Sequence, residues 1–407
     1  MIEIGLAAVV PTRNRADLAI KATESLLRMD CFETILISDN SNEEQESSAL
    51  EAWASRNRHV TYVRPPKALS MAAHWDWAIG QLLDEPQVTH ALLATDRMIM
   101  YPRLSELLQG LVQRHPKDVI IFTTDFLWDH VSPPELLLTR WSGKLLRLRS
   151  RRLLEAASGL RLHNPYPIPR LMNSIVPVNV FADVRKRYGS ICNRSIAPDY
   201  AFGFRSLAVT ESVLFIDRPF ALLHATYRSN GTAFARGIAS RDRNDFLAML
   251  DSSFNADAPI PIFPTITNTI LHEYGSASKM ADFPAIDFPA YLRRVGSEVE
   301  RLENPEERDA LRTVLKQLGA TSTSPPAIYR LRQLLILFAA PKTQPFWRLI
   351  GRRMRLYPPG DAGLQLSDPE TAIAYAESHP RRRHILPLHL RAMLPAYEVI
   401  TDGSAAS

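Results

Sequence analysis

Short, largely apolar runs alternate with longer amphipathic stretches over the first 125 residues of the chain. The apolar runs predict strands, and the first of them is continuous enough for a strand that is buried on both faces. The stretches between them place apolar residues at helical spacing, for example Met71, Trp75 and Ile79. Strands separated by helices of this length predict βαβ units and an α/β fold with a mainly parallel sheet. The predicted strands cover residues 4–10, 34–38, 59–63, 91–94 and 119–122.

The pattern changes after a proline-rich run at residues 258–264. Such a run is typical of a boundary between two parts of a chain. Beyond it helical patterns dominate, including residues 291–302 and 305–318, and the stretch from 360 to the end mixes short helices with a polar tail. We therefore expect one part at residues 1–257 and a mostly helical part at residues 258–407.

The composition is that of an ordinary globular protein, with 407 residues of which 46% are hydrophobic and 22% charged. The formal net charge of +5 is mild, and two cysteines cannot form a disulfide framework or a zinc site. The first residues contain an acid where a signal peptide needs bases, and the longest apolar window has seven residues, too few to span a membrane. These features predict a cytoplasmic protein.

A carboxylate and a guanidinium follow the predicted strand at residues 91–94, as Asp96 and Arg97. In open α/β sheets ligands bind at the carboxyl ends of strands, so both side chains are candidates for holding a ligand. A single carboxylate is a poor site for a divalent cation. Arg97 is a candidate substitute for such a cation, because a guanidinium is always charged and binds phosphate oxygens in a fork.

Four segments in this order resemble the family 2 glycosyltransferases of the GT-A fold, over roughly residues 1–245. They are Val9–Arg15, Ile37–Ser41, Ala91–Pro102, and Asn179–Gly189 with the Ala197–Tyr200 run and Arg205 that follow it. The resemblance implies a GT-A domain at residues 1–257, with a Rossmann-like, mainly parallel sheet flanked by helices, and a helical C-terminal extension of unassigned role. It also implies an inverting transferase that moves a sugar from a nucleotide-diphosphate sugar to an acceptor hydroxyl, in polysaccharide or glycolipid synthesis. The alternative is an inactive nucleotide-sugar-binding subunit or scaffold.

The resemblance places the donor at the ends of the first two strands. Pro11, Thr12, Arg13 and Asn14 lie between a strand and a helix, where free N–H groups and the helix dipole can face an anion. The alternative is a plain strand–helix turn in which Asn14 caps the helix. Asp39 resembles the acid that contacts the nucleobase or ribose, although the run that it begins is also a strong turn signal.

The family binds Mn²⁺ or Mg²⁺ through an Asp-x-Asp motif, and the corresponding run here is Asp96-Arg97-Met98. Three interpretations follow from the missing second acid. Asp96 holds a metal together with His224 and ligand phosphates; Arg97 contacts the diphosphate without a metal; or the activity is lost. We favour the use of Arg97 without a metal cofactor.

The base and the closing segment are the remaining candidates. Asp199 resembles the family's general base, which removes the proton of the acceptor hydroxyl. Pro198 replaces the Glu often found before it, and Asp199 also suits a helix N-cap. Arg228 lies where the family closes its site on the diphosphate, and His224 is either a ligand there or a structural residue.

Two basic stretches without acids lie at residues 136–154 and 310–360. Basic amphipathic segments of this kind bind anionic membranes, which predicts peripheral association with the inner face of the membrane and a glycan or lipid-linked acceptor. The alternative is that both stretches pack on the catalytic part with their bases in solvent. No nucleic-acid partner is expected, because no reader motif accompanies the bases.

Overall fold

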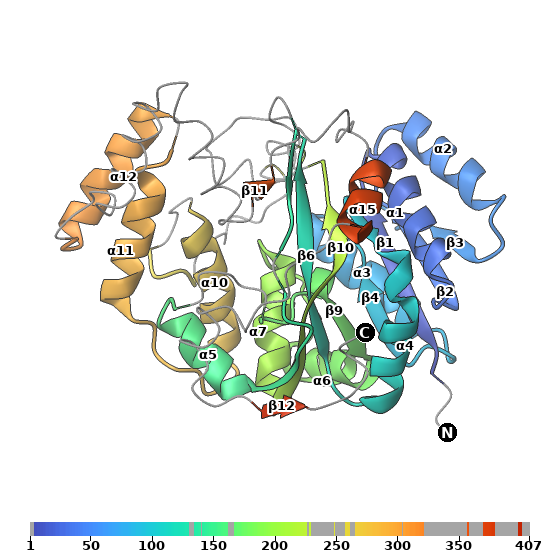
Figure 1. The fold of residues 1–407 in the computed structure, drawn as a ribbon. Coiled ribbons are helices and arrows are strands. Elements are labelled where there is room, and N and C mark those ends of the chain that lie inside the picture. Colours follow the sequence, from blue (N-terminus) through green and yellow to red (C-terminus); the bar gives the residue numbers. More distant parts are fainter. Residues whose placement is uncertain are drawn as a thin grey trace, which may run out of the picture.

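One mixed sheet runs through the described part of the protein, and helices cover both of its faces (Figure 1). Twelve strands of the described residues belong to this sheet, and its main path has the order β12-β8-β10-β6-β9-β4-β1-β2-β3. The computed structural model describes residues 4–129, 134–139, 141–161, 167–225, 228, 248, 257–260, 265–302, 304–320, 356–357, 369–378 and 398–400.

The N-terminal part forms the predicted βαβ units. Strands β1, β2, β3 and β4 pair in parallel, with β1 between β2 and β4. The elements in chain order are β1 (Leu6–Thr12), α1 (Ala16–Met29), β2 (Thr34–Asp39), α2 (Glu44–Ala54), β3 (Val60–Val63), α3 (Met71–Leu83) and β4 (His90–Leu93). The α/β class and the parallel arrangement of these strands are confirmed.

The second half of the sheet is built around two longer strands, β6 (Ile120–Trp128) and β10 (Ser212–Leu223), which are parallel to each other. The short strand β9 (Ser174–Pro177) lies between β4 and β6 and is antiparallel to both. The remaining strands are short antiparallel additions, namely β5 (Met98–Met100), β7 (Glu135–Leu137), β8 (Leu145–Arg149), β11 (Leu356–Tyr357) and β12 (Glu398–Ile400).

Alternate residues of β1 face two separate cores. Ala7 and Val9 pack with α3, whereas Leu6, Ala8 and Val10 pack with α1, as the two-residue period of a strand requires. The first core also contains α5 (Ser150–Ser158), α6 (Val178–Tyr188) and α7 (Pro198–Val209), and the second contains α4 (Ser105–Arg114). Helices on both sides of the sheet therefore explain why β1 is apolar on both faces.

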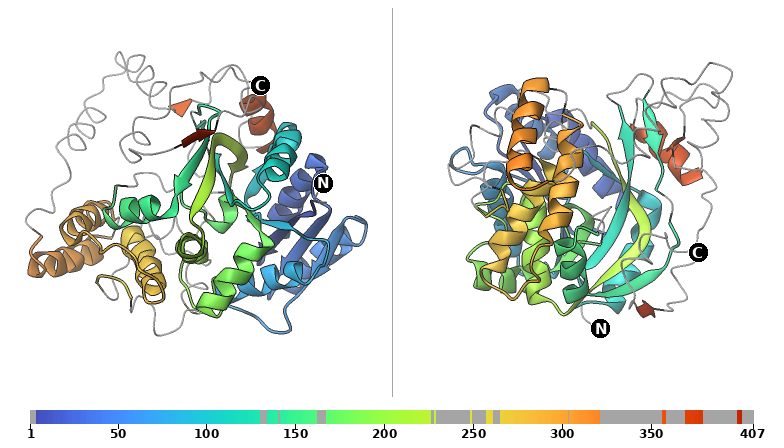
Figure 2. Two further views of the ribbon diagram at one scale, coloured as in Figure 1. Left: turned by 90° about the horizontal axis from the view of Figure 1, so that it is seen from below. Right: turned by 90° about the vertical axis from the view of Figure 1, so that its left-hand side faces the viewer.

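The C-terminal part is mostly helical in its described residues, as predicted. Figure 2 shows α10 (Ile266–Ser278), α11 (Phe288–Val299) and α12 (Pro305–Gln317) on the side of the sheet that α7 covers. Residues of α10 and α11 belong to the same apolar core as α7. The helix α15 (Pro369–Ser378) lies on the other side, where Ala372, Ile373 and Ala376 join the second core. The division at residues 257 and 258 remains a prediction.

The basic stretch at residues 136–154 does not fold as one amphipathic helix. It contains strand β8 and helix α5, and its described arginines face acids. Arg147 donates two hydrogen bonds to Asp118, of 2.7 and 3.0 Å, and Arg151 and Arg152 both lie against Glu155. Most of the second basic stretch lies outside the described residues. No helix in the described ranges is both long and apolar enough to cross a membrane.

Candidate active site at the carboxyl edge of the sheet

Polar side chains gather where the parallel strands of the sheet end. Thr12 and Asp39 are the last residues of β1 and β2, and Asp96 follows β4 after two residues. At the other end of the same edge, Asp129 follows β6 and His224 follows β10. The carboxyl ends of parallel strands are the usual ligand site of such a sheet, so this edge is the candidate site.

The pair Asp96-Arg97 occupies the corner of a tight turn. The N–H of Met98 donates to the carbonyl of Thr95 over 2.9 Å, and β5 then runs back along β10. One carboxylate oxygen of Asp96 accepts a hydrogen bond of 3.2 Å from the Thr12 hydroxyl. The other lies 3.6 Å from a guanidinium nitrogen of Arg15. The turn therefore holds Asp96 against the β1–α1 loop.

His224 lies beside this turn. Its backbone N–H donates to the carbonyl of Arg97 over 3.0 Å, and the N–H of the next residue donates to the carboxylate of Asp129 over 2.7 Å. Burial lowers the pKa of His224 to about 4, against the opposing effect of Asp129. The imidazole is therefore neutral at physiological pH. Its Nε2 atom is buried and has no hydrogen-bond partner among the described residues.

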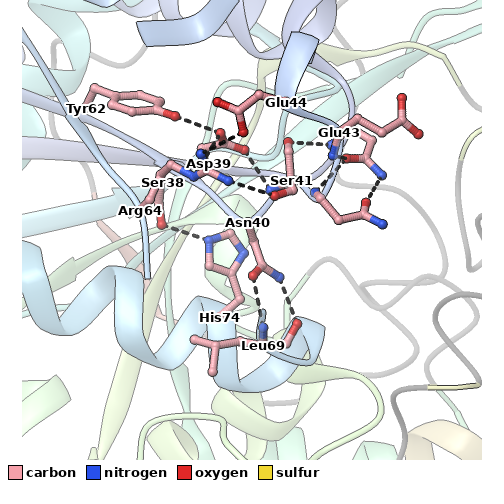
Figure 3. A network of polar contacts seen from close by, with 12 residues as sticks. Ser38, Asp39, Asn40, Ser41, Glu43, Glu44, Tyr62, Arg64, Leu69 and His74 are labelled. Carbon is pink, nitrogen blue, oxygen red and sulfur yellow. Dashed lines mark hydrogen bonds and ion pairs between the residues drawn. The ribbon is translucent and has the colours of Figure 1, made fainter. Parts of the chain in front are cut away.

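Asp39 is at the centre of a buried polar network (Figure 3). Its carboxylate accepts hydrogen bonds of 2.8 Å from the N–H of Ser41 and from the hydroxyl of Tyr62, with Arg64 at 3.8 Å. Burial alone would raise the pKa of Asp39, but these donors hold it below its usual value. The side chain is 0% exposed. A nucleoside could therefore use this carboxylate only by displacing donors that belong to the protein.

The β1–α1 loop differs from its prediction in one respect. Asn14 does not cap α1: the N-cap residue is Arg15, which makes no side-chain capping bond, and the first free N–H of the helix donates to Glu46 over 2.6 Å. The amide of Asn14 instead accepts bonds from the N–H groups of Asn42 and Glu43. Asn14 ties two loops of the edge together, with a backbone φ of 54° that asparagine tolerates better than most residues.

The other predicted donor residues surround the same loop. Pro11 and Thr12 are buried at the end of β1, and Arg13 is half-buried. Arg228 donates a hydrogen bond of 2.8 Å to the carbonyl of Asn14, and Arg15 donates one of the same length to the carbonyl of Arg228. These reciprocal bonds bring the segment at Arg228 onto the β1–α1 loop. Residues 226–227 and 229–247 lie outside the described residues.

Asp199 reaches the same edge through Arg170. Strand β9 is antiparallel to β4, so its first residue, Ser174, lies at the carboxyl end of β4. The short helix η2 (Leu171–Asn173) directly precedes Ser174 and lies at the same end. Arg170 precedes that helix, and its guanidinium lies 3.7 Å from the carboxylate of Asp199. The side chains are 13% and 17% exposed, respectively. Asp199 is therefore placed on the site edge, in the first turn of α7.

Asp199 is in the first turn of α7 but is not its N-cap. The N-cap residue is Ala197, and no side chain of its own caps the helix. Burial raises the pKa of Asp199, while the Arg170 guanidinium acts in the opposite direction. A carboxylate with a raised pKa is a stronger proton acceptor than an exposed one. The roles of Asp199 and of the predicted donor residues remain predictions.

The described residues at this edge do not form a protein-built metal site. Among the described residues, no three His, Cys, Asp or Glu side chains come together as metal ligands. Asp96 already faces Thr12 and Arg15, so its oxygens are engaged by a donor and by a positive charge. Divalent cations such as Mg²⁺ need several oxygen ligands. Any metal here would depend on oxygens from the bound donor.

Sequence reasoning missed three residues of the edge. Arg15 lies within the quoted Val9–Arg15 segment but was not expected to face Asp96. The strand predicted at residues 119–122 extends beyond its apolar run to Trp128, and Asp129 directly follows it. Arg170 has no local signal, since only the pairing of β9 with β4 places it on the edge.

No family model matches this chain, and the search of the curated proteins gives no match. Solved structures that resemble it include TarS of S. aureus, with a TM-score of 0.41, 10% identity, and coverage of 76% of this chain and 50% of that chain. The TarS 1–349 complex with UDP-GlcNAc has a TM-score of 0.41 and 12% identity, and 76% of this chain and 84% of that chain are covered. The chain thus spans about half the length of full TarS. These values are too low to transfer an activity or a residue role.

Proposed function

We propose that the chain is an inverting glycosyltransferase of the GT-A type that uses a nucleotide-diphosphate sugar. One observation carries the proposal: the fold brings Thr12, Asp96 and Asp199 to a single edge of the sheet, although they are far apart in the sequence. That edge is where α/β sheets usually bind ligands, and it holds a carboxylate, Asp199, whose pKa is raised by burial. The four segments that resemble family 2 glycosyltransferases support the same assignment.

The diphosphate of the donor would lie at the Asp96 turn. Arg15 and Arg97 are positively charged there, and a guanidinium binds phosphate oxygens in a fork. When the bond between the anomeric carbon and the diphosphate oxygen breaks, its electron pair stays on the leaving nucleoside diphosphate. Positive groups that are already in place stabilise that charge without reorganisation. We propose that these arginines replace a divalent cation.

Asp199 would be the general base on the acceptor side. It takes the proton of the acceptor hydroxyl while the hydroxyl oxygen forms its bond to the anomeric carbon, opposite the leaving diphosphate. Attack from that side inverts the anomeric configuration. Arg170 would hold the carboxylate in place, because the two side chains face each other over 3.7 Å in a half-buried setting.

The acceptor is proposed to be a glycan or a lipid-linked glycan, in polysaccharide or glycolipid synthesis on the cytoplasmic side of the membrane. The pairing of Arg147, Arg151 and Arg152 with acids weakens the case for residues 136–154 as a membrane surface. Peripheral association would then depend on the second basic stretch, at residues 310–360.

A second candidate function is binding of a nucleotide sugar without transfer. One observation favours it: the Asp96-Arg97-Met98 run lacks the second acid of the family's metal motif, which the resemblance links to stabilising the leaving diphosphate. Such a protein would bind a donor at the Asp96 turn and release no nucleotide.

Calorimetric titration with UDP-, GDP- and dTDP-sugars, in Mn²⁺ and in EDTA, tests the donor site. We expect one class of donor to bind with similar affinity in both buffers, and to raise the melting temperature of the folded state. Loss of binding in EDTA would contradict the proposal that arginines replace the cation, and would show that donor binding needs a divalent metal ion. Failure of every donor to bind would contradict both candidate functions.

A further inference from the structure

The helix α10 contributes a buried carboxylate to the loop that precedes Asp199. Glu273 is 1% exposed, and its Oε1 atom accepts hydrogen bonds from the N–H groups of Ile196 and Ala197, of 2.7 and 3.0 Å. Ala197 is the N-cap of α7, and Asp199 follows two residues later. Glu273 thus accepts the N–H of the N-cap residue from another helix, a bond that in a capping box comes from a Glu or Gln three residues further along the same helix.

Two other charged side chains hold the same loop. Asp76 of α3 accepts bonds from the N–H groups of Ile191 and Cys192, of 2.6 and 3.0 Å. Arg205 of α7 donates to the carbonyl of Ile191 over 3.1 Å. The loop before Asp199 is therefore fixed at one end by Asp76 and Arg205 and at the other by Glu273. Of these three side chains, Glu273 is the one that bonds to the residues directly before α7.

The packing of α10 on α7 keeps Glu273 in this position. Phe204 of α7 and Tyr274 of α10 are in edge contact, with ring centroids 5.2 Å apart. Leu271 and Ala277 of α10 are buried in the core that also contains Phe202. A buried carboxylate on a rigid helix holds its acceptor oxygen at a fixed place, and small displacements of a reacting group cost large factors in rate.

We propose that Glu273 is a positioning residue for Asp199, so that α10 is part of the acceptor-activating site. The proposal rests on the proposed function, since it assumes that Asp199 is the base. It gives a role to the C-terminal region, to which the sequence alone assigns none. Glu273 itself touches no reacting atom.

The test compares two substitutions at one position. Glu273→Ala removes the acceptor of both N–H groups, and we expect kcat for transfer to fall at least tenfold while the Kd for the donor stays unchanged. Glu273→Gln keeps a carbonyl oxygen that can accept the same bonds, so kcat should recover to within threefold of wild type. Burial raises the pKa of Glu273 to about 7, so the group is uncharged over the acid limb of the pH profile of kcat/KM, and Glu273→Gln should leave that limb in place.

Glu298 of α11 provides a matched control. It accepts the N–H of Thr267 over 2.9 Å near the start of α10, so it too is a carboxylate that binds the N-terminus of another helix. Glu298→Ala should lower stability but leave kcat and the acid limb unchanged. The measurements are steady-state kinetics, donor titration and urea unfolding of all three variants in the full chain.

The outcomes separate the two proposals. If wild type turns over a donor and Glu273→Ala behaves like Glu298→Ala, the positioning role is wrong and the proposed function stands. If Glu273→Gln is as slow as Glu273→Ala, the role is also wrong, because an acceptor oxygen at this place would not restore the rate. If wild type releases no nucleotide from any donor, the proposed function fails, and the positioning role fails with it.

Discussion

Asp96 faces one guanidinium group and is followed in the chain by a second arginine. Arg15 lies 3.6 Å from its carboxylate, and Arg97 is the next residue in the same turn. The Thr12 hydroxyl fixes the other carboxylate oxygen. At the scale of single residues, this arrangement suits an anionic ligand that meets guanidinium groups, with Asp96 orienting them.

Substitution of Arg97 by Gln should therefore weaken donor binding. A hydrogen bond to a charged group contributes about 1.5–3 kcal/mol, so the Kd for the nucleotide sugar should rise about 10- to 100-fold in EDTA. Arg149→Gln is the control, because that side chain is 71% exposed and lies on β8. Calorimetry in EDTA measures both. An unchanged Kd for Arg97→Gln would show that Arg97 does not contact the donor.

At the scale of elements, strand β8 shows how two arginines of one strand differ. Arg147 makes a two-pronged, half-buried contact with Asp118, whereas Arg149 faces Glu211 at 3.7 Å in solvent. Exposed pairs contribute little to stability, and forked contacts that are partly buried contribute more. The two residues are two positions apart and therefore lie on the same face of the strand, so they form an internal comparison.

Arg147→Ala should reduce the free energy of unfolding by about 1–3 kcal/mol, because it leaves the Asp118 carboxylate without its main partner. Arg149→Ala should cause a loss too small to measure. Urea unfolding followed by circular dichroism gives both values. Equal losses in the two variants would contradict the contact made by Arg147.

At the scale of the whole molecule, buried ionisable groups set the pH dependence of stability. Burial lowers the pKa of His74, His90 and His224 from 6.5 to about 4, so between these values the unfolded chain binds more protons. Their contribution to stability is complete above pH 6.5 and declines as the pH falls. Burial raises the pKa of Glu273 to about 7 and also raises that of Asp199, which acts in the opposite direction.

The three histidines outweigh the two carboxyl groups. The free energy of unfolding should therefore fall by on the order of 1 kcal/mol per pH unit from pH 6.5 to 4.5. Urea unfolding at three pH values measures the slope. His90→Gln should flatten the slope, and His59→Gln, at an exposed position, should leave it unchanged. A free energy that is constant or rises on acidification would contradict the burial of these histidines.

The sequence predicts the elements that neighbouring residues determine, and misses the contacts between segments that are far apart in the chain. The units from β1 to β4 follow from hydrophobic periodicity, because each strand and the helix after it are set by neighbouring residues. Strand β9 was not predicted: it has four residues, and its partners lie more than fifty positions earlier in the chain. Its antiparallel insertion is what carries Arg170 to the site.

The same limit applies to single site residues. Asp96 and Asp39 could be proposed because each directly follows an apolar run. The alternative in which Asn14 caps α1 is wrong, since a local pattern cannot show that Glu46, 30 residues away, accepts the first N–H of the helix. The contact of Glu273 with Ile196 joins residues 77 positions apart. Contacts of this kind arise only from the packing of helices on the sheet.

The most direct test of the account is the release of nucleoside diphosphate from a panel of UDP-, GDP- and dTDP-sugars in EDTA. We predict that wild type turns over at least one donor, and that Asp199→Asn lowers this rate by about 100-fold or more while it still binds the donor. Asp183→Asn, at an exposed position of α6, should match wild type. If wild type releases no more nucleotide than Asp199→Asn with every donor, the site at the carboxyl edge is not a glycosyltransferase centre.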